Sequence, residues 1–358
     1  MRRAATTSWT LILACTVLAS AGRAFAQVQP PATPQAVPTP PPTQAEIDNE
    51  HQGPETDDQW LDRTQQGVYD MVWKSAMHMD RWFGSEHPPA DYQGASGSLT
   101  PSVLWDQFDG FQPKLRFRVQ MPLPQLNERF NAFVGRVDRE EYISEAVQDS
   151  GALPRQYGPI DQEQTLAGIS YHTPPKQGSR FDADAGLRLQ FPLDPFLKGS
   201  YVYERGDSVS GLMSLRETVF WQNSQHAGVT SRVDLEKLFL RDLWLLRWTA
   251  SASFSERSQG VYGYSAITAL RGLPNRRALA FEAGIDGSSD MPVPVHEYGF
   301  KAAYRQAVLR DWLVMEVRTS VTWPRVKVEQ DRKTSWGLGI GFEMFFGTDE
   351  FLARPVTF

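Results

Sequence analysis

From about residue 97 to residue 346 the sequence alternates apolar and polar residues with a period of two, and this alternation constrains the fold most strongly. The stretch 180–191, RFDADAGLRLQF, puts Phe, Ala, Ala, Leu, Leu and Phe on one side and mostly charged residues on the other. KLRFRVQM, RWTASASF and WGLGIGFEMF repeat the pattern. Successive side chains of a β-strand point to opposite faces, so this part of the chain is predicted to be all β.

Clusters of proline, glycine, aspartate and asparagine divide the alternating region into runs of roughly ten residues, which we predict to be strands. About fourteen are expected, and twelve is the alternative count. The predicted strands lie near 97–108, 111–122, 127–140, 163–173, 179–192, 195–205, 211–222, 227–238, 243–255, 260–271, 277–286, 295–307, 311–323 and 335–346. An even number of antiparallel strands is typical of an up-and-down barrel formed by one bacterial chain.

The length of these runs separates a transmembrane barrel from a soluble β-sandwich. About ten residues at ~3.3 Å each, tilted by ~40°, cover roughly 25 Å, the height of an apolar membrane band. Ordinary strands have about five or six residues. Tryptophan favours membrane interfaces, and Trp105, Trp221, Trp244, Trp312, Trp323 and Trp336 lie near predicted strand ends, whereas Trp248 does not. These observations favour the transmembrane barrel.

The N-terminus has the order of a secretory signal peptide over residues 1–26. Arg2 and Arg3 precede an apolar run too short to span a membrane, and Ala24-Phe25-Ala26 forms the predicted cleavage site. A lipoprotein signal acylated at Cys15 is the disfavoured alternative. Cys15 is the only cysteine, so cleavage leaves a mature chain without disulfides or thiol chemistry.

Two further segments precede the predicted barrel. Residues 27–55 are proline-rich at first and are predicted to form a disordered linker, extended over 27–44. Residues 56–84 begin with a capping-box spacing between Thr56 and Gln59 and carry one apolar stripe, which predicts an amphipathic helix. Residues 348–358 form a C-terminal tail after a barrel predicted over 97–347.

The export signal, the cysteine-free mature chain, the alternating strands and the terminal Phe358 together resemble bacterial outer-membrane β-barrel proteins over roughly residues 97 to 358. This resemblance implies an outer-membrane location, contact with outer-membrane lipid, and insertion by the barrel-assembly machinery, which reads a C-terminal strand commonly ending in Phe. Pro355 interrupts the last residues, so the strand that is read is alternatively 335–346, ending in Phe345-Phe346. With both chain ends in the periplasm, the long connection 141–162 is expected on the outer side.

Within such a barrel the apolar face meets lipid and the charged face lines the lumen. Leu115, Phe117, Val119 and Met121 are therefore expected to face lipid. The residues predicted to line the lumen are Lys114, Arg116, Arg118, Asp182, Asp184, Arg188, Arg247, Glu316, Arg318 and Glu343, together with Arg216, Arg232, Asp234 and Glu236. They either pair with one another or form a basic stripe, concentrated on 111–122 and flanked by Arg247 and Arg318, that selects anions.

The predicted function is a porin-like passage of small polar or anionic solutes. An envelope-organising protein acting on a periplasmic partner through 56–84 is the first alternative, since a simple pore needs no such helix. An outer-membrane hydrolase is less favoured: His226 and His296 could join Ser224 or Ser289, but no motif supports a triad. No cofactor is expected, and His78, Asp80 and His87 are not expected to bind a metal.

The net charge also bears on partners. The formal charge is −6, and removing Arg2, Arg3 and Arg23 with the signal peptide gives −6 − 3 = −9. A mature chain this acidic argues against nucleic acid as a partner.

Overall fold

The computed structural model describes residues 95–123, 129–147, 163–207, 210–239, 244–258, 260–325 and 327–347. The predicted signal peptide, the linker, the helix over 56–84 and the tail 348–358 lie outside the described residues, as do His78, Asp80 and His87. Within the described ranges, no helix has the length and apolar character needed to cross a membrane.

The described residues form fourteen strands in one closed antiparallel barrel, which confirms the predicted fold class and the higher strand count. The strands are β1 (Ser96–Asp106), β2 (Gly110–Pro122), β3 (Phe130–Asp138), β4 (Glu163–His172), β5 (Ser179–Arg188), β6 (Asp194–Asp207), β7 (Gly211–Gln222), β8 (His226–Phe239), β9 (Trp244–Ser255), β10 (Val261–Leu273), β11 (Arg277–Ser288), β12 (Val295–Ala307), β13 (Leu313–Thr322) and β14 (Ser335–Gly347). A short helix, α3 (Arg139–Tyr142), follows β3.

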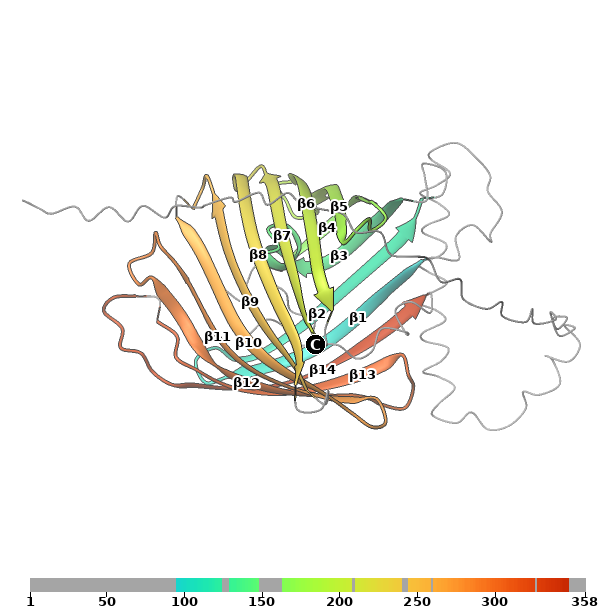
Figure 1. Ribbon diagram of the computed structural model, residues 1–358. Helices are drawn as coiled ribbons and strands as arrows, with labels where there is room; N and C mark the ends of the chain where they lie inside the picture. Colours follow the sequence, from blue (N-terminus) through green and yellow to red (C-terminus); the bar gives the residue numbers. More distant parts are fainter. Residues whose placement is uncertain are drawn as a thin grey trace, which may run out of the picture. The chain divides into compact units, whose positions relative to one another are not determined.

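Each strand pairs with its neighbours in sequence, and the ring closes between the first strand and the last (Figure 1). The closing ladder runs from Ser96 opposite Gly347 to Asp106 opposite Gly337. Closure pairs every strand on both sides and so leaves no sheet edge open to other chains.

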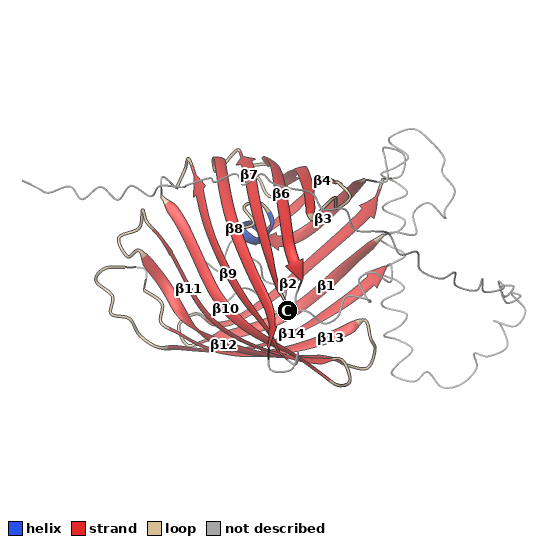
Figure 2. Cartoon of the chain, in the orientation of Figure 1, coloured by secondary structure: helices blue, strands red, loops and turns tan. Residues whose placement is uncertain are grey.

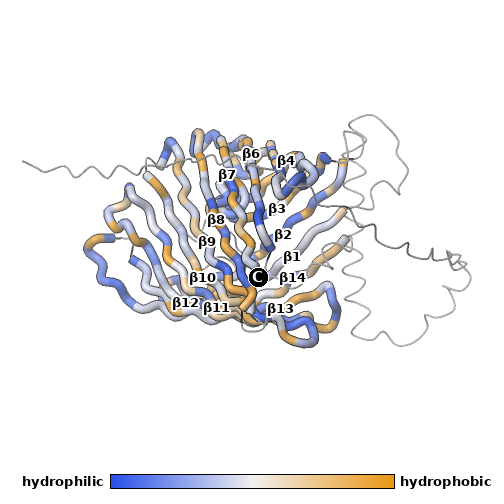
Figure 3. Tube along the Cα trace, in the orientation of Figure 1, coloured by the Kyte–Doolittle hydropathy of each residue, from blue (hydrophilic) through white to orange (hydrophobic). Residues whose placement is uncertain are grey.

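Backbone register sorts the alternating residues into two faces. Trp105 pairs with Phe111 on one side and Leu338 on the other, and Val103 pairs with Ile340, so these apolar residues share a face. Phe111, Val219, Phe300, Trp336 and many other large apolar side chains on this face are exposed. The alternation of apolar and polar residues is visible along the strands in Figure 3. An apolar exterior is what an outer-membrane barrel presents to lipid.

The tryptophans at strand ends keep the places that the sequence suggested, and Trp248 is accommodated by a polar neighbour. Trp105, Trp221, Trp244 and Trp336 lie within one residue of a strand terminus. Trp248 lies in the middle of β9 on the outer face, and its Nε1 donates a hydrogen bond to Ser265 Oγ at 3.1 Å. This bond satisfies the indole N–H on an otherwise apolar surface.

One residue expected to face lipid is instead buried. Leu115 is exposed as predicted, but Met121 is 2% exposed and packs with Ala95, Ala132 and Phe346. The cluster forms where β14 closes onto β1 and β2, at the end of the barrel that carries Ser96 and Gly347. Met121 is the last apolar residue of its strand, and local packing at this end covers it.

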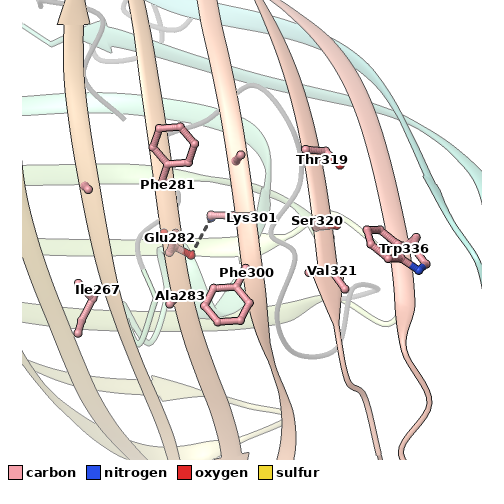
Figure 4. Close-up of a pocket in the computed structure, with 12 residues that line it drawn as sticks. Ile267, Phe281, Glu282, Ala283, Phe300, Lys301, Thr319, Ser320, Val321 and Trp336 are labelled. Atoms are coloured by element: carbon pink, nitrogen blue, oxygen red, sulfur yellow. Dashed lines mark ion pairs between the residues drawn. The ribbon is translucent and has the colours of Figure 1, made fainter.

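A groove of about 380 Å³ hollows the outer face over β10 to β14 (Figure 4). It exists because each phenylalanine there opposes an alanine: Phe281 pairs with Ala302, and Phe300 pairs with Ala283. Trp336 lies at its β14 side. Beneath it, on the inner face, Lys301 Nζ and Glu282 Oε1 are 3.0 Å apart.

Candidate functional site

The connection after β3 turns into the barrel instead of remaining at its rim. Residues 139–147, called here the inner segment, begin with α3, which Figure 2 shows in blue within the ring of strands. Ile143 packs against Phe133, Leu166 and Phe196 of the β3, β4 and β6 walls. The next residues reach the opposite wall.

The far end of the inner segment is anchored on β9 and β10. Ala146 and Val147 pack against Tyr264 and Ala266, and Ser251 Oγ donates a hydrogen bond to the Ala146 carbonyl oxygen. In a ring of fourteen strands β3 and β10 are seven apart in both directions. The inner segment therefore lies inside the barrel along the half of the ring from β3 to β10 and narrows the lumen.

The inner segment is also held by one carboxylate, Glu145, which accepts four side-chain hydrogen bonds. Its Oε2 accepts from Ser200 Oγ at 2.7 Å, Thr218 Oγ1 at 2.7 Å and Arg216 Nη1 at 2.9 Å. Its Oε1 accepts from Lys198 Nζ at 3.0 Å. We call the four donors, which lie on β6 and β7, the Glu145 cage. Both oxygens of one carboxylate are thus bound by a preformed wall.

Register explains why β6 and β7 can build this cage. Ser200 pairs directly with Thr218, and Lys198 and Arg216 lie two residues away on the same face. Ser200 and Thr218 have no exposed surface, and Lys198 is 6% exposed. Small hydroxyl side chains leave room for the carboxylate, while the longer cations reach it from either side.

Lys198 also fixes the neighbouring part of the inner segment. Its Nζ donates to the Tyr142 carbonyl oxygen at 2.7 Å, lies 3.1 Å from Asp184 Oδ2, and is 4.3 Å from the centre of the Tyr142 ring. One ammonium group therefore joins two carboxylates, a backbone carbonyl and an aromatic face.

The position of Glu145 is unfavourable for its backbone conformation but favourable for its negative charge. Its φ angle is +52°, in the left-handed region that residues other than glycine seldom adopt, at a cost of about 1–3 kcal/mol. Burial alone would raise the pKa of this carboxyl group, but Lys198 and Arg216 outweigh burial and lower its pKa well below the usual range. Glu145 is therefore ionised at neutral pH and bound as an anion.

The predicted lumen residues all share the face on which the inner segment packs. On β5, Asp184 binds Lys198, Asp182 lies 3.0 Å from His172, and Arg188 lies 3.7 Å from Asp194. On β8 and β9, pairs form between Arg232 and Asp234 at 3.0 Å and between Arg247 and Glu236 at 2.6 Å. Mutual charge pairing, one of the two expectations, accounts for these residues.

A second charged group lines the wall formed by β12 to β14. Arg305 Nη2 lies 2.5 Å from Glu343 Oε2, and Arg305 Nε lies 3.7 Å from Glu316 Oε2. Glu316 and Arg318 are each 2% exposed. They oppose Gly341 and Gly339 of β14, so these two glycines lie beside the two charged side chains.

Three cations of β2 form a row along the inner face of the barrel. Lys114, Arg116 and Arg118 lie on the inner face and retain intermediate exposure. The Arg118 side chain is 42% exposed, and its Nη2 is 3.7 Å from Glu141 of the inner segment. Solvent in the lumen can therefore reach this row.

The expected flanks of that basic row need correction. Arg247 lies on β9, seven strands from β2 in either direction, so it stands on the opposite wall and does not flank the row. Arg318 lies three strands away on β13 and is buried. The closed ring, which sequence spacing does not reveal, decides both placements.

The sequence pattern did not single out Glu145, Lys198, Ser200 or Thr218 as site residues. Lys198, Ser200 and Thr218 alternate with outward-facing residues in their strands. They could have been predicted by assigning every polar residue of the alternating pattern, and not only the charged ones, to the inner face. Glu145 carries no such signal, because nothing local in a connection predicts that it turns into the lumen.

The residues considered for catalysis have other partners. Ser224 Oγ donates to Asp194 Oδ2 at 2.5 Å, and Ser289 Oγ accepts from the Val261 N–H at 2.8 Å. Across the described ranges, no three His, Cys, Asp or Glu residues come together as a metal site.

A closed fourteen-strand barrel, with an apolar exterior and charged residues inside, is an outer-membrane β-barrel architecture. No protein-family model matches the chain, and no curated protein matches it by sequence. Among solved structures, it is similar to outer-membrane barrels at low identity.

Three of these structures illustrate the similarity. An anion-selective porin from Comamonas acidovorans has 11% identity and a TM-score of 0.42, covering 70% of this chain and 98% of that one. The outer membrane channel DcaP of Acinetobacter baumannii has 10% identity and a TM-score of 0.43, covering 70% and 96%. OpdK of Pseudomonas aeruginosa, solved with vanillate, has 9% identity and a TM-score of 0.37, covering 70% and 98%. Similarity at this level gives no information on solute or mechanism.

Proposed function

We propose that the barrel is an outer-membrane channel for small polar solutes and that it favours anions. The observation that carries the proposal is the row of partly exposed cations on the inner face of β2, Lys114, Arg116 and Arg118. A row of like charges along a pore raises the local concentration of counter-ions.

The inner segment supports a selective channel over a wide one. It runs inside the ring from β3 to β10 and brings Glu141 within 3.7 Å of Arg118. A solute then passes beside the inner segment, past Lys114 and Arg116 of the β2 row, where both hydrogen-bonding and charged groups are available. Restriction by size and attraction by charge act at the same place.

The proposal extends to location and orientation. The signal peptide is removed on export, and both chain ends face the periplasm. The inner segment then enters the lumen from the extracellular side, because it follows β3 at the barrel end opposite Ser96 and Gly347. Protease digestion of intact cells, with epitope tags inserted beside Asn275 and beside Ser224, tests the orientation: only the Ser224 tag is expected to be cleaved.

Charge reversal on β2 tests anion preference. Full-length protein carrying Arg116→Glu and Arg118→Glu is reconstituted in planar bilayers, and the reversal potential is measured in a salt gradient. The expected result is a shift from anion toward cation preference. The control is Arg271→Glu, because Arg271 lies on the outer face near a strand end and packs over Trp244.

The outcomes are distinct. An unchanged reversal potential in the doubly reversed protein refutes the role of the β2 row. Absence of conductance in the wild-type protein and in all variants, with a heat-modifiable folded barrel, refutes the channel itself. Deleting residues 27–90 tests the envelope-organising alternative, which predicts lost co-purifying partners with conductance unchanged.

A further inference from the structure

We infer that the Glu145 cage is a carboxylate-binding site and that the chain's own Glu145 is its resident ligand in this structure. The site consists of Lys198, Ser200, Arg216 and Thr218, and its proposed external ligand is a small monocarboxylate solute. This inference rests on the proposed channel function only for its physiological role; binding at the cage can be tested without conduction.

The donors are arranged for a planar group with two oxygen atoms. Three donors meet one oxygen of Glu145 at 2.7–2.9 Å, and Lys198 meets the other at 3.0 Å. Chloride has a single centre and cannot satisfy both positions. A carboxylate satisfies them with the bond lengths typical of charge-assisted hydrogen bonds.

The cage belongs to the wall and not to the inner segment. All four donors lie on β6 and β7, whose paired register fixes their spacing independently of Glu145. Arg216 Nε is buried and makes no hydrogen bond with any described residue, so the site has a donor that Glu145 does not use. The wall formed by β6 and β7 can therefore bind an anion without the inner segment. Glu145 is one group that occupies this binding site.

The side facing the lumen gives a route for exchange. The side chains of Arg216 and Glu145 are 17% and 12% exposed, compared with 6% for Lys198. The unfavourable left-handed backbone at Glu145 also favours departure once another anion satisfies the donors. A carboxylate solute is therefore expected to meet Arg216 first and then displace Glu145.

Propionate is the probe, because its atoms match the side chain of glutamate beyond the Cα atom. The test variant is Glu145→Gly, which removes the carboxylate while suiting the positive φ angle. Binding is measured by titration calorimetry on full-length, detergent-solubilised protein, with heat-modifiable migration confirming the fold. Glu145→Ala is a second variant, which also removes the carboxylate but keeps the Cβ atom.

Propionate is expected to bind the Glu145→Gly protein at one site in the millimolar range or tighter, and to bind the wild type more weakly because Glu145 competes. Propionamide at the same concentration, and chloride at matched ionic strength, are expected not to bind there. Adding Arg216→Met is expected to weaken propionate binding about tenfold to a hundredfold, the range of one charge-assisted hydrogen bond.

Glu217→Gly is the matched control, because Glu217 is a carboxylate on the outer face of the same strand that accepts a hydrogen bond from Ser231 Oγ at 2.6 Å. It is expected to leave propionate binding at the wild-type level. Failure of propionate to bind either folded Glu145 variant, or equal binding by propionamide, overturns the inference. If propionate binds but no form conducts in bilayers, the carboxylate site stands and the channel proposal fails.

Discussion

Replacing Glu145 by glutamine is expected to release the inner segment from the lumen wall. The amide has nearly the shape of the carboxylate, but it carries no charge for Lys198 and Arg216, and its NH2 group points at a donor whichever way it is turned. Removing one partner of a buried ion pair costs about 3–5 kcal/mol. Since these side chains keep some exposure, we take about 3 kcal/mol.

This loss of about 3 kcal/mol determines how often the inner segment is released from the wall. At about 1.4 kcal/mol per factor of ten, a loss of about 3 kcal/mol raises the released fraction of the inner segment roughly a hundredfold. The barrel itself is expected to remain folded, because the strand ladders do not depend on Glu145.

Thiol labelling measures the released fraction. Ala146 is 1% exposed when the segment is seated, so a cysteine there reacts with a methanethiosulfonate only after release. Cys15 lies in the predicted signal peptide, and the remaining sequence has no cysteine to interfere. Labelling of Ala146→Cys is expected to be about a hundredfold faster with Glu145→Gln, following the released population when reclosing is fast.

A control and a pH series complete the experiment. Glu217→Gln, on the outer face, is expected to leave the labelling rate unchanged. The pKa of Glu145 is lowered in the folded state, so its contribution is complete above about 4.3, the ordinary value for glutamate, and is lost as pH falls through the folded pKa. The seated fraction should therefore stay constant between pH 7 and 5. Equal labelling rates in the Glu145 and Glu145→Gln proteins would refute the role of the carboxylate.

Three other changes have defined expectations. Gly97→Leu should prevent ring closure and abolish the heat-modifiable gel shift, because a Cβ atom there would overlap the Phe346 ring and the Arg118 backbone oxygen. Lys198→Met should destabilise the folded barrel by about 3–5 kcal/mol in urea titration, since it leaves two carboxylates without their shared cation. Trp248→Phe should cost about 1 kcal/mol in the same assay, and adding Ser265→Ala should then cost little more, because both remove one hydrogen bond.

The alternation of residues by itself determined the strands and their two faces, and it limited the number of strands to fourteen or twelve. Side chains alternate across a strand regardless of what surrounds it, so Leu115 and Arg116 had to point to opposite sides. Ten-residue runs and tryptophans at their ends indicated the apolar environment of one face. These are local properties, and a single sequence contains them.

Only the tertiary structure decided which lumen residues meet. Arg247 and Arg116 both point inward, but closure of fourteen strands places them on opposite walls. Met121 has the alternation of a lipid-facing residue, yet packing where the ring closes buries it.

The inner segment shows the difference most clearly. Nothing in residues 139–147 marks Glu145 as an anchor, because its four partners are 53 to 73 residues away along the chain. Strand geometry follows from neighbours in sequence, so the alternation predicted it. The position of a loop depends on side chains that the fold brings together. The lumen site could therefore be recognised only in the closed barrel.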